Sequence, residues 1–137
     1  MGAAPAQTGP ARPSRPRRSR LSRSADFDRV YRQGRSHANR VLVLHAFPRG
    51  DDEEPRLGLS VSRKVGGAVE RNRVKRLIRE AFDREVERVP AGIDVVVSAR
   101  PAARETAERD GLDGIHAALC ELLATATGAA AERGEER

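Results

Sequence analysis

The chain has 137 residues, of which 26 are Lys or Arg, 20 are Asp or Glu and one, Cys120, is cysteine. This length suits one folded domain with tails, and a single cysteine excludes both an intrachain disulfide and a zinc site built from several thiolates. The longest apolar run, residues 41–47, is too short to cross a membrane. We therefore expect a cytoplasmic protein that has no membrane contact.

Positive charge is concentrated in two blocks of the sequence. Residues 1–34 contain eight Arg against two Asp, and residues 63–79 contain seven Lys or Arg against one Glu. From residue 101 onward, four Arg face eight Asp or Glu. Blocks of this kind indicate a polyanionic partner, with nucleic acid as the leading interpretation.

The composition also divides the chain into three regions. Residues 1–19 are mostly Ala, Pro, Arg, Gly and Ser, so they lack the apolar surface needed to offset the entropy of ordering. We expect them to be a disordered basic arm. Residues 20–127 are predicted to form a single RNA-binding domain, and residues 128–137 a disordered tail.

The first predicted elements are a helix of residues 24–33 and a strand of residues 40–47. Ser24 is a suitable cap for the helix and Gly34 a suitable stop. In the strand, Leu42, Leu44 and Ala46 occupy one face and the alternate residues the other. An acidic turn, residues 48–55, follows the strand.

The second strand, residues 57–62, has two very different faces. Leu57, Leu59 and Val61 share one face, whereas the other carries only glycine and serine, which lets a ligand backbone come close. A long helix of residues 68–89, a strand of residues 93–99 and a helix of residues 112–126 complete the order α-β-β-α-β-α. The Val95–Val97 run implies a central strand. This order predicts an α+β fold with helices against a small mixed sheet, in which residues 57–99 form a parallel crossover.

The helix of residues 68–89 carries an apolar face and an adjoining cationic arc about 100° wide. The apolar positions are Val74, Leu77, Ile78, Ala81, Phe82, Val86 and Val89, and the arc consists of Asn72, Lys75, Arg76 and Arg79. One interpretation is a solvated face neutralised by Arg76–Glu80 and Arg79–Asp83 pairs. However, Arg71, Lys75 and Arg79 repel one another at i, i+4 spacing, which favours contact with a nucleic acid.

Two interpretations are open for the aromatic pair Phe27 and Tyr31. Their i, i+4 spacing is typical of core residues, but unpaired bases also stack on such rings. The neighbouring arginines and the small residues of the second strand favour a stacking surface.

The sequence predicts no protein active site and no metal or cofactor bound by the protein. His37, His45 and His116 belong to no HxxxH or HExxH motif and to no Cys/His cluster, and no phosphate-binding loop is present. Cys120 is expected to be a core residue.

Two segments resemble one known family. Residues 58–66 read Gly-Leu-Ser-Val-Ser-Arg-Lys-Val-Gly, and residues 71–79 read Arg-Asn-Arg-Val-Lys-Arg-Leu-Ile-Arg. Together with residues 21–36, they are similar to the protein subunit of bacterial ribonuclease P. The resemblance covers residues 20–127 and implies a ribosomal-protein-like sandwich with a left-handed β-α-β crossover.

The resemblance also implies a function and its residues. The implied activity is endonucleolytic removal of the 5′ leader of precursor tRNA, with catalysis by an RNA subunit, Mg²⁺ required by the assembled enzyme, and no protein partner. The implied catalytic-RNA contacts are Arg63, Lys64, Arg71, Asn72, Arg73, Lys75, Arg76 and Arg79. The implied leader cleft contains Phe27, Tyr31, Val43, His45 and Ser60, where His45 replaces an aromatic residue common in the family. The alternatives are a non-catalytic RNA-binding module and a protein-only nuclease.

Overall fold

The computed structural model describes residues 20–21 and 24–136, with side chains as far as residue 127. The basic arm predicted for residues 1–19 lies outside the described residues. The elements, in chain order, are α1 (Ser24–Gln33), β1 (Arg35–Ala38), β2 (Leu42–Pro48), β3 (Arg56–Ser60), α2 (Ala68–Glu85), the 3₁₀ turn η3 (Val86–Arg88), β4 (Ile93–Ala99) and α3 (Ala102–Glu136).

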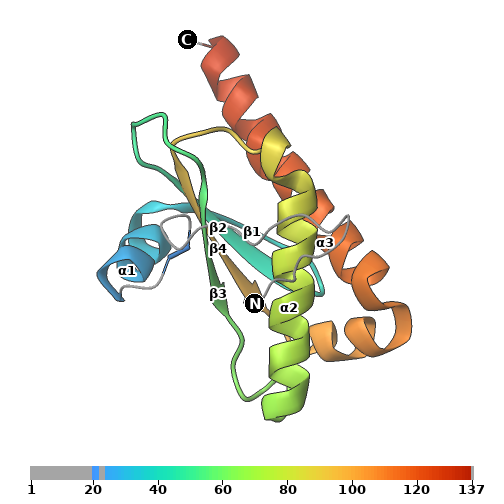
Figure 1. The fold of residues 1–137 in the computed structure, drawn as a ribbon. Coiled ribbons are helices and arrows are strands. Elements are labelled where there is room, and N and C mark those ends of the chain that lie inside the picture. Colours follow the sequence, from blue (N-terminus) through green and yellow to red (C-terminus); the bar gives the residue numbers. More distant parts are fainter. Residues whose placement is uncertain (1–19, 22–23, 137) are drawn as a thin grey trace, which may run out of the picture.

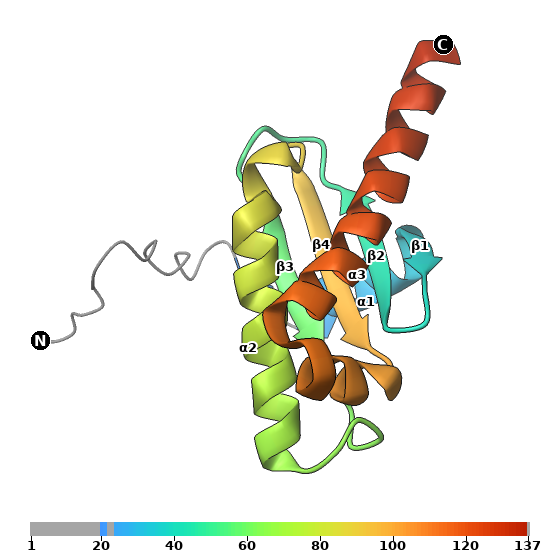
Figure 2. The same cartoon turned by 90° about the vertical axis from the view of Figure 1, so that its right-hand side faces the viewer.

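The four strands form one mixed sheet in the order β1-β2-β4-β3. β2 is antiparallel to β1 and to β4, whereas β3 is parallel to β4. Helix α1 covers one face of the sheet, and α2 and α3 cover the other (Figures 1 and 2). The α+β class and the parallel β3–α2–β4 connection are confirmed. The left-handed crossover stays a prediction.

The strand faces follow the alternation of the sequence. Leu42, Leu44 and Ala46 of β2 are buried beneath α2 and α3, while the alternate residues face the α1 side and are half-buried. In β4, Val95 and Val97 join the core under α2 and α3, and Val96 joins the smaller cluster under α1. β4 is therefore buried on both faces, as its valine run predicted.

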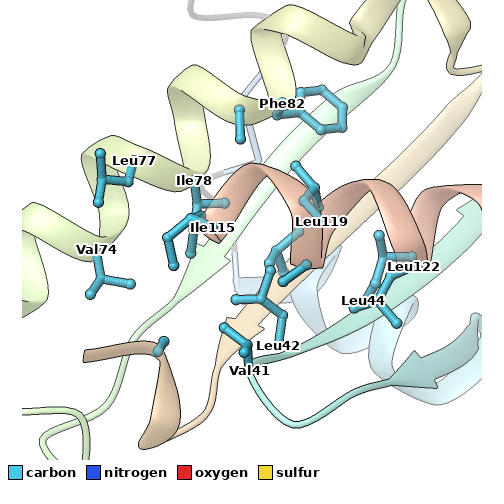
Figure 3. Packing of buried hydrophobic residues seen from close by; sticks show 14 of the residues in the cluster. Val41, Leu42, Leu44, Val74, Leu77, Ile78, Phe82, Ile115, Leu119 and Leu122 are labelled. Carbon is cyan, nitrogen blue, oxygen red and sulfur yellow. The ribbon is translucent and has the colours of Figure 1, made fainter. Parts of the chain in front are cut away.

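The main core lies between the sheet and the helix pair α2–α3 (Figure 3). Phe82 and Ile78 of α2 and Ile115 and Leu119 of α3 are fully buried there. These residues meet Leu42 and its neighbours on β2. The predicted apolar face of α2 is confirmed, and it fixes which arc of this helix faces outward.

Several predicted element boundaries are wrong. A short polar strand, β1, was missed because four residues with no buried side chain give no period-2 signal. Helix α2 ends at Glu85 and gives way to η3, rather than running to residue 89. The predicted strand 57–62 is β3, Arg56–Ser60.

The last helix is longer than residues 112–126 at both ends. α3 begins at Ala102, bends at Gly111 and continues to Glu136. Gly111 has φ 61° and ψ −140°, a conformation that favours glycine over residues with a Cβ atom. The helical turns before it were missed because they bury small residues, Ala103 and Ala107, among many charged ones. The domain limits at residues 20 and 127 stay predictions.

None of the helices in the described part of the chain is both long enough and apolar enough to cross a membrane.

Candidate RNA-binding surfaces

Glu70, the one acidic residue of the basic block 63–79, lies in the first turn of α2, and both of its carboxylate oxygens have partners there. Gly67 is the residue before the helix, and its N–H donates to Glu70 Oε1 at 3.0 Å. The other carboxylate oxygen, Glu70 Oε2, lies 3.9 Å from Arg104 Nη2. Because Glu70 has these partners, its charge is used at the helix start and against α3 instead of along the cationic arc.

The arc of α2 faces solvent, as the position of its apolar face requires. Asn72, Arg76 and Arg79 are exposed and Lys75 is half-buried. Glu80 pairs with Arg84 at 3.8 Å and not with Arg76, which counts against the alternative of a neutralised face. Among the described residues, neither Arg76 nor Arg79 forms an ion pair. We call Asn72, Lys75, Arg76 and Arg79 the α2 arc; three of its four side chains are cationic.

The remaining predicted RNA contacts do not share this arc. Arg71 and Arg73 lie about 160° apart around the helix, on opposite flanks of α2. Arg73 Nη2 donates to the carbonyl of Ala107 in α3 at 3.2 Å. Arg71 is half-buried, and its Nε has no hydrogen-bond partner in the described part. Arg63 and Lys64 are exposed in the loop before α2.

On the other side of the sheet, an aromatic residue of α1 meets a histidine of β2. The ring centroids of Tyr31 and His45 are 4.8 Å apart, at an interplanar angle of 87°. Tyr31 is 40% exposed, so part of its side chain is accessible to an unpaired base. Phe27 lies 6.4 Å from Tyr31, further under α1.

Phe27 is half-buried and packs against the smaller core cluster under α1, and its role as a leader contact stays a prediction. A Cβ atom added to Gly58 of β3 would lie 2.7 Å from Phe27 Cζ and 2.9 Å from Leu21 Cβ. The space beside Gly58 is therefore filled by Phe27. The interpretation from the sequence, that the missing side chain lets a ligand backbone come close, is wrong at this position. Of the two interpretations of the aromatic pair, the core fits Phe27 and the stacking surface fits Tyr31.

The two other predicted leader contacts flank a residue that sequence reasoning missed. Ser98 of β4 pairs with Val43 of β2 on one side and with Ser60 of β3 on the other. The Oη of Tyr31 lies 3.5 Å from Ser98 Oγ, which places Ser98 on the α1 face. We call this set the α1-side surface: Tyr31, Val43, His45, Ser60 and Ser98. Ser98 becomes visible only once the strand order is known.

His45 is a weakly basic member of this surface. Burial lowers the pKa of its imidazole, so the ring is neutral at neutral pH. Its Nδ1 is buried and has no hydrogen-bond partner among the described residues. His45 thus contributes a flat, uncharged ring edge next to Tyr31.

The arginines around α1 differ in availability. Arg29 donates to Asp26 at 2.7 Å and lies over the ring of Phe47 at 5.5 Å from its centroid. Arg32 and Arg35 are exposed and form no ion pair with any described residue. Arg32, on α1, is the cation next to the α1-side surface, whereas Arg35 pairs with Ala46 and so lies on the α2–α3 side of the sheet.

A buried aspartate ties together the end of the sheet at which β4 begins, on the same side as α1. Asp94 of β4 is fully buried, and its carboxylate accepts hydrogen bonds from Arg49 Nη1 at 2.6 Å and from Arg56 Nε and Nη2, both at 2.8 Å. Two arginines therefore satisfy this charge, and they are not available to an RNA.

The comparisons with known proteins identify the family of this chain. A family model described as Ribonuclease P matches residues 16–123. The chain belongs to the ribonuclease P protein family. It is 45% identical over 82 residues to the ribonuclease P protein component of Bacillus velezensis. The matched segment covers 60% of this chain and 71% of that protein. With the component of Clostridioides difficile it shares 41% over 91 residues, 66% of this chain and 79% of that protein.

Solved structures of ribonuclease P proteins share the fold. The Staphylococcus aureus protein matches with a TM-score of 0.71 and 37% identity, over 79% of this chain and 94% of that one. The Thermotoga maritima protein matches with a TM-score of 0.69 and 36% identity, over 76% and 94%. The predicted family is confirmed: this chain is a protein component of the tRNA-processing endoribonuclease, a ribonucleoprotein whose RNA carries catalysis.

Proposed function

We propose that this ribonuclease P protein binds two RNAs through opposite faces of its sheet. The α2 arc, with Arg63 and Lys64 at the start of the helix, contacts the catalytic RNA. The α1-side surface contacts the single-stranded 5′ leader of precursor tRNA. The observation that carries the proposal is the row of exposed arginines on α2 that form no ion pair within the described residues, in a member of this family.

The α2 arc suits a folded RNA because its charges are fixed in position. Phe82, Ile78 and Leu77 anchor the opposite side of the helix in the core. Arg76 and Arg79 therefore project from a rigid element. Because the backbone of this element is already fixed, it loses little conformational entropy when the two side chains contact phosphates. Each neutralised phosphate releases condensed counterions, which makes the affinity fall steeply with salt. Arg71 and Arg73, on the flanks, contact the RNA at the borders of the arc.

The α1-side surface suits a strand of variable sequence. The exposed part of Tyr31 offers stacking to any base, and Ser60 and Ser98 offer hydroxyl groups beside it. Arg32, which is exposed on α1, supplies positive charge for the leader backbone. Recognition by stacking and phosphate contact is tolerant of sequence, which an enzyme that processes many precursors requires.

The Mg²⁺ ions needed for cleavage are proposed to bind the RNA and not this chain. On the α1 side, both carboxylate oxygens of Asp94 already accept hydrogen bonds from arginines, so neither oxygen is left for a metal ion. The cytoplasmic location and the absence of a protein partner stay predictions.

A test of leader binding uses Tyr31→Ala, with Tyr31→Phe as the matched control that keeps the ring. The affinity of the assembled ribonucleoprotein is measured for precursor tRNA with a leader and for mature tRNA. Stacking of one base contributes about 1–3 kcal/mol, so Tyr31→Ala should lower precursor affinity about 5- to 150-fold and leave mature tRNA affinity unchanged. An equal loss for both tRNAs, or none, would reject the leader surface.

A further inference from the structure

Three potential metal ligands meet where α2 ends against α3, away from both proposed RNA surfaces. Glu85 is in the last turn of α2, and His116 and Cys120 are one helical turn apart on α3. One ligand atom from each residue lies within 4.8 Å of the other two. The expectation that His116 belongs to no Cys/His cluster is wrong, because the His-x-x-x-Cys spacing places His116 and Cys120 on one side of α3. Glu85 joins them only through the packing of the two helices.

The three groups converge on a single nitrogen. Glu85 Oε2 is 2.8 Å from His116 Nε2, and Cys120 Sγ is 3.4 Å from the same atom. A ring nitrogen carries either one proton or one lone pair, so when His116 donates to the carboxylate of Glu85, the thiol of Cys120 must also turn to that carboxylate, which lies within its reach. One cation placed among the three atoms would instead bond to all of them.

The distances are close to those of a zinc site. With Zn–S about 2.3 Å and Zn–N and Zn–O about 2.0–2.2 Å, tetrahedral ligands are separated by about 3.3–3.6 Å. The present N–S distance of 3.4 Å already fits. The N–O distance of 2.8 Å must lengthen by about 0.5 Å, which a rotation of the Glu85 side chain supplies.

The surroundings also fit a bound cation. Arg88 Nη1 donates to Glu85 Oε1 at 3.1 Å and leaves Oε2 directed at the imidazole. Ligating carboxylates are commonly oriented by such a second hydrogen bond. The Glu85 side chain is 11% exposed and that of His116 is 28% exposed, so the site is sheltered but keeps one side open to water.

We propose that Glu85, His116 and Cys120 form a binding site for a single thiophilic divalent cation, Zn²⁺, with water as the fourth ligand. Thiolate, imidazole and carboxylate together match the donors that zinc takes in proteins, whereas Mg²⁺ prefers oxygen alone. The ion links the end of α2 to α3. It thereby holds the helix that carries the α2 arc, but the site does not depend on RNA binding.

Cobalt is the probe, because Co²⁺ bound to a thiolate has a near-ultraviolet charge-transfer band and this chain has only one cysteine. The full chain is reduced, stripped of metal and titrated with Co²⁺. One equivalent should saturate the band, and one equivalent of Zn²⁺ should abolish it. Glu85→Gln and His116→Gln should each weaken Co²⁺ binding at least about 10-fold, the lower end of what loss of an outer-sphere partner costs. The controls Glu80→Gln and His37→Gln should not.

A second measurement needs no variant. The chain has three histidines, and on addition of one equivalent of Zn²⁺ the imidazole signals of His116 should shift in a nuclear magnetic resonance spectrum while those of His37 and His45 stay in place. The proposal would be overturned if the cobalt band were absent. It would also be overturned if Glu85→Gln and His116→Gln bound Co²⁺ as tightly as the unchanged chain, or if the His116 signals did not shift.

Discussion

The charge of the α2 arc is open to a quantitative test with Arg76→Ala/Arg79→Ala. Both side chains are exposed and lie on the solvent side of a helix whose other side is buried. Neither forms an ion pair among the described residues, so their removal breaks no internal contact and should leave the fold unchanged. Its effect should appear only in binding of the catalytic RNA.

The size of the effect follows from counterion release. Each phosphate contact contributes about 0.7 to 0.9 to the slope of log affinity against log salt. Loss of two contacts should therefore reduce the slope by about 1.4 to 1.8. Between about 50 and about 200 mM salt, the ratio of wild-type to variant affinity should shrink about tenfold.

The assay is equilibrium binding to ribonuclease P RNA at several salt concentrations. The matched control is Arg84→Ala, which removes an arginine of the same helix that is paired with Glu80 at 3.8 Å. This control should leave the slope within about half of one contact's contribution. The reasoning is refuted if the double variant keeps the wild-type slope, or if Arg84→Ala lowers it by as much per charge.

Four further predictions concern stability and are read from urea or thermal unfolding. Phe82→Ala should cost about 3–5 kcal/mol, because the ring is fully buried; a loss under about 1 kcal/mol would contradict this packing. Gly58→Ala should cost about 1–3 kcal/mol, since its methyl group would overlap the ring of Phe27; an unchanged midpoint would show that the ring moves freely. Asp94→Asn should cost about 3–5 kcal/mol by removing the buried charge that pairs with two half-buried arginines, Arg49 and Arg56; a neutral result would mean that water compensates the arginines. Burial lowers the pKa of His45, so the unfolded chain takes up this proton first, near pH 6.5, and stability falls as the pH drops from there towards the native pKa. His45→Phe should remove that part of the acid-side loss, and identical pH profiles would contradict it.

The parts of the fold that were predictable have strong internal periodicity. The apolar face of α2, the alternation of β2 and the valine run of β4 each record which side is buried. β1 carries no such record, because it pairs at the sheet edge through its backbone and buries no side chain. The first turns of α3 were missed for a related reason, since the residues they bury are small.

The candidate sites show the same division between local and tertiary information. Helical spacing alone identified the solvent-facing arc that contains Arg76 and Arg79. It did not separate Arg73, whose bond to the carbonyl of Ala107 depends on where α3 packs. Ser98 and the Glu85–His116–Cys120 cluster likewise bring together residues from elements that only the folded chain places side by side.

The central strand explains how one small domain would keep the two proposed RNA surfaces apart. β4 has Val95 and Val97 packed under α2 and α3, and Val96 packed under α1, so both helical layers rest on the same strand. A residue of the α2 arc and a residue of the α1-side surface therefore have a fixed separation, set by the thickness of a sheet with a close-packed core on each side. Because the catalytic RNA and the leader are both anionic, bringing them together costs electrostatic repulsion. A rigid sheet with cations on both faces lowers that repulsion while holding the two RNAs at a constant spacing, and a flexible basic segment of equal charge would provide only the first of these effects.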